Sequence, residues 1–148
     1  MTTSGLGSSL AYLLSRADRS VNRALAAVLA GEEVTVEQWR IMRALADGHG
    51  DSMGVLAEAV LMPAPTLTKA VDRLIDRALV YRGPSMGDRR RVAVLVSDRG
   101  AELLARVDGA VAEHHRLIAL AFGQERTEQL MRDLESLVEA LDYAELRA

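Results

Sequence analysis

Residues 83–96, GPSMGDRRRVAVLV, hold the side chains best suited to chemistry and admit two interpretations. Gly83, Ser85 and Gly87 fit the G-x-S-x-G pattern, in which a serine on a sharp strand-to-helix turn is the nucleophile of a hydrolase. The next four residues, 88–91, read Asp-Arg-Arg-Arg and are typical of a loop tip that contacts phosphates. Such arginines are attracted to the negative potential of the DNA minor groove.

The residues that follow Ser85 disfavour the hydrolase. Arginines and a β-rich segment come next, so no helix N-terminus would lie beneath the serine to stabilise an oxyanion. Nothing in the sequence places His49, His114 or His115 near it as a base. A chain of 148 residues is also short for an α/β-hydrolase. We therefore expect that the chain is not an enzyme and that the glycines are turn residues.

Composition narrows the function classes further. The chain has no cysteine, which excludes disulfides, thiolate catalysis, cysteine oxidation as a sensor and cysteine zinc sites. His114 and His115 are neighbours, and successive helical residues diverge by about 100°, so they cannot easily share an ion. We expect no metal and no cofactor. No basic residue precedes Arg16 and the apolar runs are too short to span a bilayer, which predicts a soluble, cytoplasmic protein without a membrane partner.

The charge distribution favours DNA as a partner in spite of a net charge of −3. Residues 61–92 hold seven basic and three acidic side chains, a net charge of +4, and the rest of the chain carries −7. A basic stripe on an acidic body steers a polyanion to one face. A solvated charged surface would show the same numbers, so the positions of the charges must decide.

Helical patterns dominate the first half of the chain. Apolar residues from Leu10 to Val28 recur at spacings of three and four, which predicts an amphipathic helix. Thr35 and Gln38 fit a capping box that opens a second helix. Ser52 can cap a short third helix, residues 53–60, and Pro65 suits the first position of a fourth. Two short helices across a tight turn are typical of a helix-turn-helix.

The pattern then changes to strands and returns to helices. Residues 79–82 and 92–96 are β-rich and flank a loop with Gly and Pro, which predicts a hairpin. Ser97 caps a long helix that Gly123 ends, with Phe122 expected on its inner face, and a last helix carries leucines at 130, 134, 137 and 141. The expected fold is therefore mainly α with a small β-hairpin wing. The terminal helices carry more apolar surface than one chain of this size can bury, which predicts a homodimer.

Two segments carry a resemblance to a known family. LTKAVDRLIDRALVYR, residues 67–82, resembles the recognition helix and first wing strand of the MarR (multiple antibiotic resistance regulator) family. GDRRRVAVLVSDRG, residues 87–100, resembles its wing signature. The resemblance implies a single domain over residues 1–148, with the winged helix-turn-helix at about 35–100 and dimerisation helices at about 6–30 and 101–148. It also implies a transcriptional regulator, with repression the expected mode, that binds a palindromic operator as a homodimer.

The resemblance assigns roles residue by residue. Asp88, Arg89 and Arg90 fall on the wing signature, with Asp88 bracing the wing and one of the arginines entering the minor groove; Arg91 is an extra charge, so the choice among the arginines stays open. The exposed face of the recognition helix comprises Pro65, Thr66, Thr68, Lys69 and Arg73. Lys69 can reach a guanine edge or a phosphate. Arg73 and Arg77 are expected to contact the DNA backbone or to pair with Asp72 and Asp76.

The resemblance also implies a small ligand, often aromatic or phenolic, whose binding releases DNA. The candidate pocket residues are Tyr12, Arg16, Trp39, Met42 and His49, although Trp39 and Met42 also lie at core spacing. One alternative remains beside the hydrolase, a winged helix that binds protein instead of DNA; Lys69 and the wing arginines disfavour it. The sequence specifies neither the operator nor the ligand.

Overall fold

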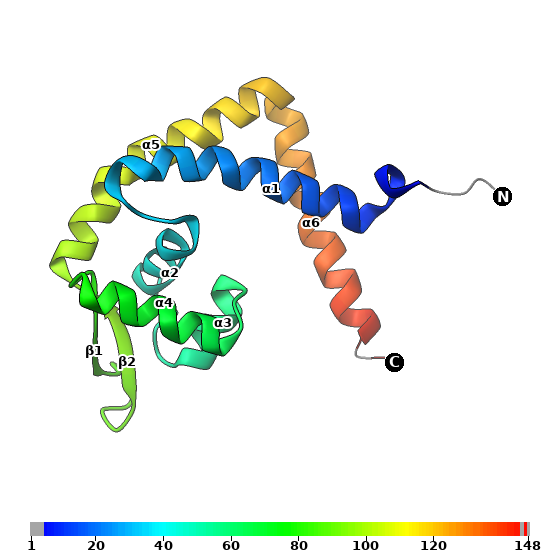
Figure 1. Ribbon diagram of the computed structural model, residues 1–148. Coiled ribbons are helices and arrows are strands. Elements are labelled where there is room, and N and C mark those ends of the chain that lie inside the picture. The colour runs from blue at the N-terminus through cyan, green and yellow to red at the C-terminus, as the bar shows by residue number, and fades with distance from the viewer. Residues whose placement is uncertain (1–4, 146, 148) are drawn as a thin grey trace. The chain divides into compact units, whose positions relative to one another are not determined.

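The computed structural model describes residues 5–145 and 147, and these form six α-helices and one two-stranded hairpin (Figure 1). The mainly helical fold with a hairpin wing that the sequence predicts is confirmed. The chain divides into two compact units, Met1–Val111 and Ala112–Ala148. The elements are α1 (Leu10–Leu29), α2 (Val36–Ala46), α3 (Met53–Val60), α4 (Ala64–Asp76), β1 (Val80–Pro84), β2 (Val92–Val96), α5 (Asp98–Phe122) and α6 (Gln124–Glu145), with short 3-10 turns at Leu6–Ser8 and Ala30–Glu32.

Side-chain caps fix where the helices of the first unit begin. Thr35 Oγ1 accepts a hydrogen bond from the Gln38 backbone N–H at 3.1 Å, and the Gln38 side chain accepts one from the Thr35 N–H at 3.2 Å. Ser52 caps α3 through the Val55 N–H, and Ser97 accepts from the Gly100 N–H at the start of α5. Each bond satisfies a backbone donor that has no partner inside its helix, so these three predicted helix starts are confirmed.

Helix α4 begins one residue earlier than predicted. Pro63 is its N-cap with extended backbone, Ala64 is the first helical residue and Pro65 is the second. Pro65 is tolerated there because N–H groups of the first turn have no partner within the helix. Leu67, Val71 and Leu74 are fully buried, as their spacing predicts.

One core holds the first unit together. Its fully buried side chains come from four helices and include Leu29 of α1, Ile41 and Met42 of α2, and Leu56 of α3. Val80 and Val94 of the hairpin join the same core. Helices α2, α3 and α4 pack against one another, so the helix-turn-helix rests on a shared apolar base.

Two glycines allow backbone segments to approach closely. A Cβ at Gly50 would overlap the carbonyl oxygen of Val94, and the Val94 N–H donates to the Gly50 carbonyl at 3.0 Å. A Cβ at Gly100 would overlap the carbonyl oxygen of Leu79. These contacts fix the hairpin at the middle of β2, against the turn after α2, and at its open end, against the start of α5.

The hairpin strands are antiparallel, with a register running from Val80 opposite Val96 to Pro84 opposite Val92. Strand β1 continues two residues beyond the predicted segment, which leaves residues 85–91 as the tip. The Arg82 side chain forms an ion pair with Asp72 of α4 at 2.9 Å. The wing is thereby connected to the helix that precedes it.

The second unit contains the end of α5 and all of α6. Gly123 separates the helices with a φ of 110°, a conformation that favours glycine. Phe122 was predicted to face inward, but it is 38% exposed, with the Arg126 guanidinium 4.1 Å from the centre of its ring. No described residue of α6 is buried. Among the described residues, no helix has both the length and the apolar composition needed to cross a membrane.

Candidate nucleic-acid interface

The outer face of α4 collects the residues that the sequence predicts for a recognition helix. Pro65, Thr66, Thr68, Lys69 and Arg73 are all exposed, because Leu67, Val71 and Leu74 turn the opposite face into the core. The Thr68 hydroxyl donates to the Ala64 carbonyl at 3.0 Å, so its hydrogen is already used within the helix.

A groove runs beside this face. Four of the five predicted residues, Pro65, Thr66, Lys69 and Arg73, line it together with Thr35, Glu37 and Gln38 from the start of α2. Its volume is about 460 Å³. Within the described part of the chain, no ion pair or hydrogen bond engages the Lys69 or Arg73 side chain, so both cations are available to a polyanion.

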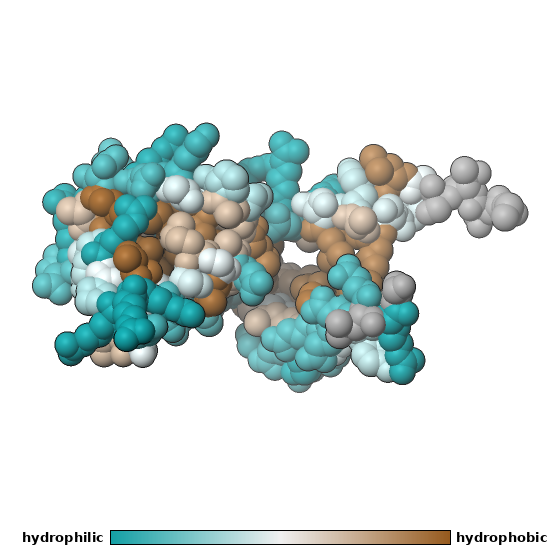
Figure 2. Space-filling model, turned by 90° about the horizontal axis from the view of Figure 1, so that it is seen from below, coloured by the Kyte–Doolittle hydropathy of each residue, from teal (hydrophilic) through white to brown (hydrophobic). Residues whose placement is uncertain are grey.

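Asp88 organises the tip of the wing. Its Oδ1 accepts from the Arg90 backbone N–H at 3.0 Å, and its carbonyl accepts from the Arg91 N–H at 3.0 Å. Its ion pair with the Arg91 side chain is long, at 3.9 Å. In the described chain, the side chains of Arg89 and Arg90 have no hydrogen bond or ion pair. Figure 2 shows hydrophilic side chains projecting from the left of the molecule, where the hairpin of Figure 1 lies.

Two arginines of the basic segment bind the protein itself. Arg77 donates to the Glu33 carbonyl at 2.8 Å, and Arg82, not Arg73 or Arg77, pairs with Asp72. Of the two roles that the sequence left open for Arg73 and Arg77, pairing with Asp72 or Asp76 is not found among the described residues, and contact with the DNA backbone stays a prediction. Glu33 lies in a left-handed turn with a φ of 55°, which directs its carbonyl toward α4; no spacing rule indicated this contact.

Ser85 is buried and hydrogen-bonded to other residues of the protein, as a residue that supports the fold would be. It is 5% exposed, its hydroxyl donates to Asp51 Oδ1 at 3.3 Å and accepts from the Gly87 N–H at 3.3 Å. Its own N–H donates to the Arg91 carbonyl across the tip. A loop and then β2 follow it, so the strand-to-helix turn that a nucleophile needs is replaced by a hairpin.

The paired histidines of α5 do not form a chelating site. Their ring centres are 5.7 Å apart, His114 is buried and His115 is exposed. Burial, followed by the nearby charge of His115, lowers the pKa of the His114 imidazole, so the neutral form is favoured. In the described residues, no group of three or more His, Asp or Glu side chains could hold a metal ion.

The predicted ligand residues are brought together only in part. Trp39 and His49 line a pocket of about 510 Å³ between α1, α2 and α3. Met42 is fully buried in the core instead, and Tyr12 and Arg16 are not among the residues that line this pocket. Its two arginines, Arg40 and Arg43, are not predicted by the sequence, because their spacing is also typical of a solvated helix face.

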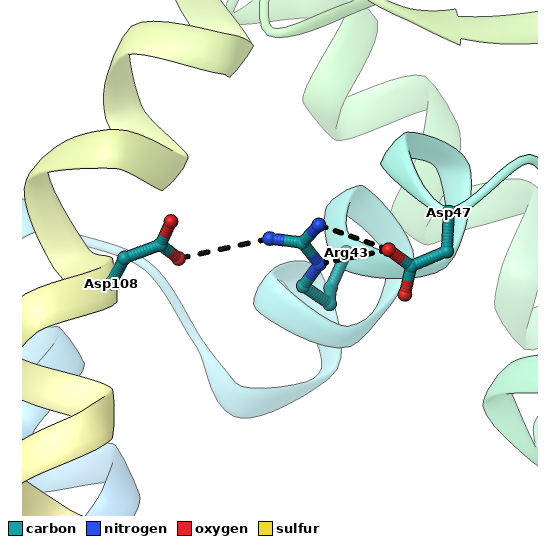
Figure 3. A network of polar contacts seen from close by, with 3 residues as sticks. All are labelled: Arg43, Asp47 and Asp108. Carbon is teal, nitrogen blue, oxygen red and sulfur yellow. Dashed lines mark hydrogen bonds and ion pairs between the residues drawn. The ribbon is translucent and has the colours of Figure 1, made fainter.

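Arg43 connects two helices at the edge of this pocket (Figure 3). Its guanidinium lies 2.9 Å from Asp47 at the end of α2 and 3.8 Å from Asp108 of α5. The hydrogen bond with Asp47 and the charges of both carboxylates raise the pKa of Arg43, against a smaller effect of burial. The indole Nε1 of Trp39 is buried and has no hydrogen-bond partner among the described residues.

Comparisons with known proteins agree with this geometry. The model of the MarR family matches residues 32–91, which hold α2, α3, α4, β1 and the wing tip. The chain is 30% identical over 105 residues to the homoprotocatechuate degradative operon repressor of Escherichia coli, covering 71% of each protein. It is 29% identical over 118 residues to the transcriptional regulator FarR of Neisseria gonorrhoeae, covering 78% of this chain and 81% of that one.

The solved structures give the same result. NadR in complex with 4-hydroxyphenylacetate superposes with a TM-score of 0.80 at 26% identity, over 90% of this chain and 98% of NadR. The likeness therefore extends beyond the helix-turn-helix to nearly the whole length of both proteins. On the match of the family model and of the repressor, the chain belongs to the MarR family of DNA-binding transcriptional regulators.

Proposed function

We propose that the chain is a homodimeric repressor that places α4 in the major groove of its operator and the wing in the flanking minor groove. The observation that carries the proposal is the set of cations without a protein partner among the described residues: Lys69 and Arg73 on α4, and Arg89 and Arg90 on the wing. The other basic side chains of residues 61–92 are Arg77, Arg82 and Arg91, and each of these has a partner within the protein.

The two elements would read DNA differently. Short side chains at the start of α4, Thr66 and Thr68, allow close approach to base edges, and Lys69 is long enough for a guanine edge or a phosphate. The wing arginines carry charge without a fixed hydrogen-bonding pattern, which suits the narrow minor groove. The cytoplasmic location that the sequence predicts agrees with this function.

A second copy of the chain is the proposed partner of the terminal helices. Helix α6 buries none of its described residues, although it carries a row of large apolar side chains: Leu130, Met131, Leu134, Val138, Leu141 and Tyr143. An apolar stripe of this length is costly in water and needs a cover. An identical helix in a two-fold dimer supplies one, and it also presents two copies of α4 to a palindrome.

The test is selection of duplexes from a random library by the purified protein, followed by fluorescence anisotropy on the selected sequence and on a scrambled duplex. We expect a palindromic preference and at least about a thousandfold tighter binding to the selected site. Light scattering should give twice the mass of one chain, 16.1 kDa. Equal, weak binding to both duplexes, or a monomer at micromolar concentration, would contradict the proposal.

We also propose that a small aromatic carboxylate binds beside Trp39 and Arg43 and releases the DNA. The pocket volume of about 510 Å³ suits such a ligand. The unpartnered indole N–H of Trp39 and the guanidinium groups of Arg40 and Arg43 suit the oxygens of the ligand. NadR, the structural relative, binds 4-hydroxyphenylacetate. Calorimetry with that compound should give heat with the wild type and with Arg16→Ala, but much weaker binding with Arg43→Ala; equal binding by both variants would contradict this site.

A further inference from the structure

Met86 is the most exposed of the large hydrophobic side chains in the described part of the chain, at 95%. It stands at the tip of the wing, one residue after Ser85. An apolar side chain so exposed adds nothing to the stability of the fold through burial. Single exposed apolar residues are ordinary, so the meaning of Met86 depends on how the tip is held and on what surrounds it.

The backbone on both sides of Met86 is held in place. On one side, the buried Ser85 hydroxyl donates to Asp51 and the Ser85 N–H donates to the Arg91 carbonyl at 2.9 Å. On the other side, the Gly87 N–H donates back to the same hydroxyl at 3.3 Å. These bonds anchor the tip to the turn before α3, and they leave the Met86 side chain in solvent.

The surroundings of Met86 combine charge with apolar surface. Arg89 and Arg90 share its loop and lack a protein partner among the described residues. Val92, at the start of β2, is 65% exposed, and Pro84 opposite it is exposed. Proteins that enter the minor groove use arginine because the groove has a negative potential. They also place apolar side chains against the sugars and base steps of the groove. A protein partner would need a much larger apolar patch than these three residues supply.

We propose that Met86 is a DNA-contacting residue, whose side chain enters the minor groove beside the wing arginines and packs against deoxyribose. The inference rests on the proposed function, since it needs the wing to lie in that groove. Methionine suits the task because its unbranched, polarisable side chain adapts to an irregular surface. The contact contributes affinity without charge, and Ser85 acts as its positioning residue.

The first test compares Met86→Ala and Met86→Gln on the selected operator. We expect Met86→Ala to weaken binding by about tenfold, the value of a partly buried methionine, and Met86→Gln to fall between it and the wild type. The dependence of affinity on salt should be unchanged, because no phosphate contact is lost. Val55→Ala, a 45% exposed position on α3, is the matched control and should bind like the wild type.

The second test uses the thioether itself as a probe. Hydrogen peroxide transfers one oxygen atom to the methionine sulfur as its O–O bond breaks, giving the sulfoxide and water. Mass spectrometry should find Met86 oxidised rapidly in the unbound protein and slowly in the saturated operator complex, while a scrambled duplex gives no protection. Met42, which is fully buried, is the internal control and should stay reduced.

The outcomes separate the two proposals. If the wild type prefers no sequence, the proposed function fails and this inference fails with it. If the wild type binds its operator but Met86→Ala binds equally well, or Met86 oxidises equally fast in the complex, the function stands and the inference is overturned. Because Met86 is almost fully exposed, neither substitution should change the urea midpoint, so loss of fold cannot produce the expected result.

Discussion

Helix α4 and the wing tip carry the same kind of charge but are built in different ways. The helix is shaped by three fully buried side chains, Leu67, Val71 and Leu74, that fix its rotation about its own axis. The tip has only one buried side chain, Ser85, and is held by hydrogen bonds that the oxygens of Asp51, Asp88 and Arg91 accept.

The difference bears on what each element can read. A helix locked by packing presents Thr66 and Lys69 at fixed positions, which base-specific contacts require. A tip held by a few hydrogen bonds keeps its backbone conformation but allows its arginine side chains to move. That combination suits a groove recognised by potential and shape. We therefore expect changes on α4 to alter specificity and changes on the wing to alter affinity for all sequences.

The largest expected effect comes from disrupting the close backbone contact between Gly100 and Leu79, which holds the wing against the start of α5. Gly100→Ala places a methyl group against the Leu79 carbonyl, and backbone cannot yield as a side chain would. We expect the free energy of unfolding to fall by at least about 2 kcal/mol, with DNA binding lost as the wing is displaced. Gly109→Ala on the same helix meets open space and should instead stabilise by about 0.5–1 kcal/mol. Urea denaturation of both variants measures the contrast, and equal midpoints would contradict it.

On the helix side, Lys69→Ala should weaken binding to the selected operator by about 1–3 kcal/mol, which is the range for a contact with a base edge. Binding to a scrambled duplex should change much less, so the specificity ratio falls. Anisotropy on both duplexes gives the ratio directly. A uniform loss on both would assign Lys69 to a phosphate and would weaken the contrast with the wing.

On the wing side, Arg90→Ala should weaken binding to both duplexes alike, by about 1.5 kcal/mol, the lower end for a hydrogen bond to a charged group. The slope of log affinity against log salt should fall by about one, since one phosphate contact is lost. A salt series on the wild type and the variant measures it. Arg82→Ala removes a charge that is paired with Asp72 and should change the slope less; equal slopes for the two variants would oppose the assignment.

The same contrast explains what the sequence could predict. Local patterns determine α4 and its neighbours: apolar spacing marks the buried face, and Thr35, Ser52 and Ser97 mark helix starts through bonds to residues three positions away. The Asp-Arg-Arg run located the wing. These features were predictable because cause and effect lie within one turn of chain.

The contacts that were missed join residues far apart in the sequence. Arg77 donates to Glu33 across 44 positions, Ser85 to Asp51 across 34, and Arg43 reaches Asp108 of another helix. Each depends on a backbone direction, such as the left-handed turn at Glu33, that has no composition signal. The G-x-S-x-G match shows how a short motif can mislead. Its serine, Ser85, holds the wing tip through a hydrogen bond to Asp51, and that partner lies outside the motif.

The smallest expected effect concerns the turn that leads into α4. Leu61 has a φ of 59° and is 87% exposed, so it holds a left-handed conformation with little packing in return. Such a conformation destabilises a non-glycine residue by about 1–2 kcal/mol, and glycine relieves this strain. Glycine also stabilises the unfolded chain by about 0.5–1 kcal/mol, because it has greater conformational freedom there, which offsets part of the gain. Leu61→Gly should therefore raise the free energy of unfolding by about 0.5 kcal/mol.

Urea midpoints of Leu61→Gly and of Val55→Gly provide the measurement and its control. Val55 is a partly exposed residue inside α3, where the backbone is helical and unstrained. Glycine at this position should therefore lower the free energy of unfolding by about 1 kcal/mol. Opposite signs at two exposed positions six residues apart would show that the helix-turn-helix carries its strain in the turn. The salt slope of DNA binding should be unchanged in Leu61→Gly, because the wing does not depend on that turn. A destabilised Leu61→Gly would mean that the exposed leucine has a packing partner that this chain alone does not supply.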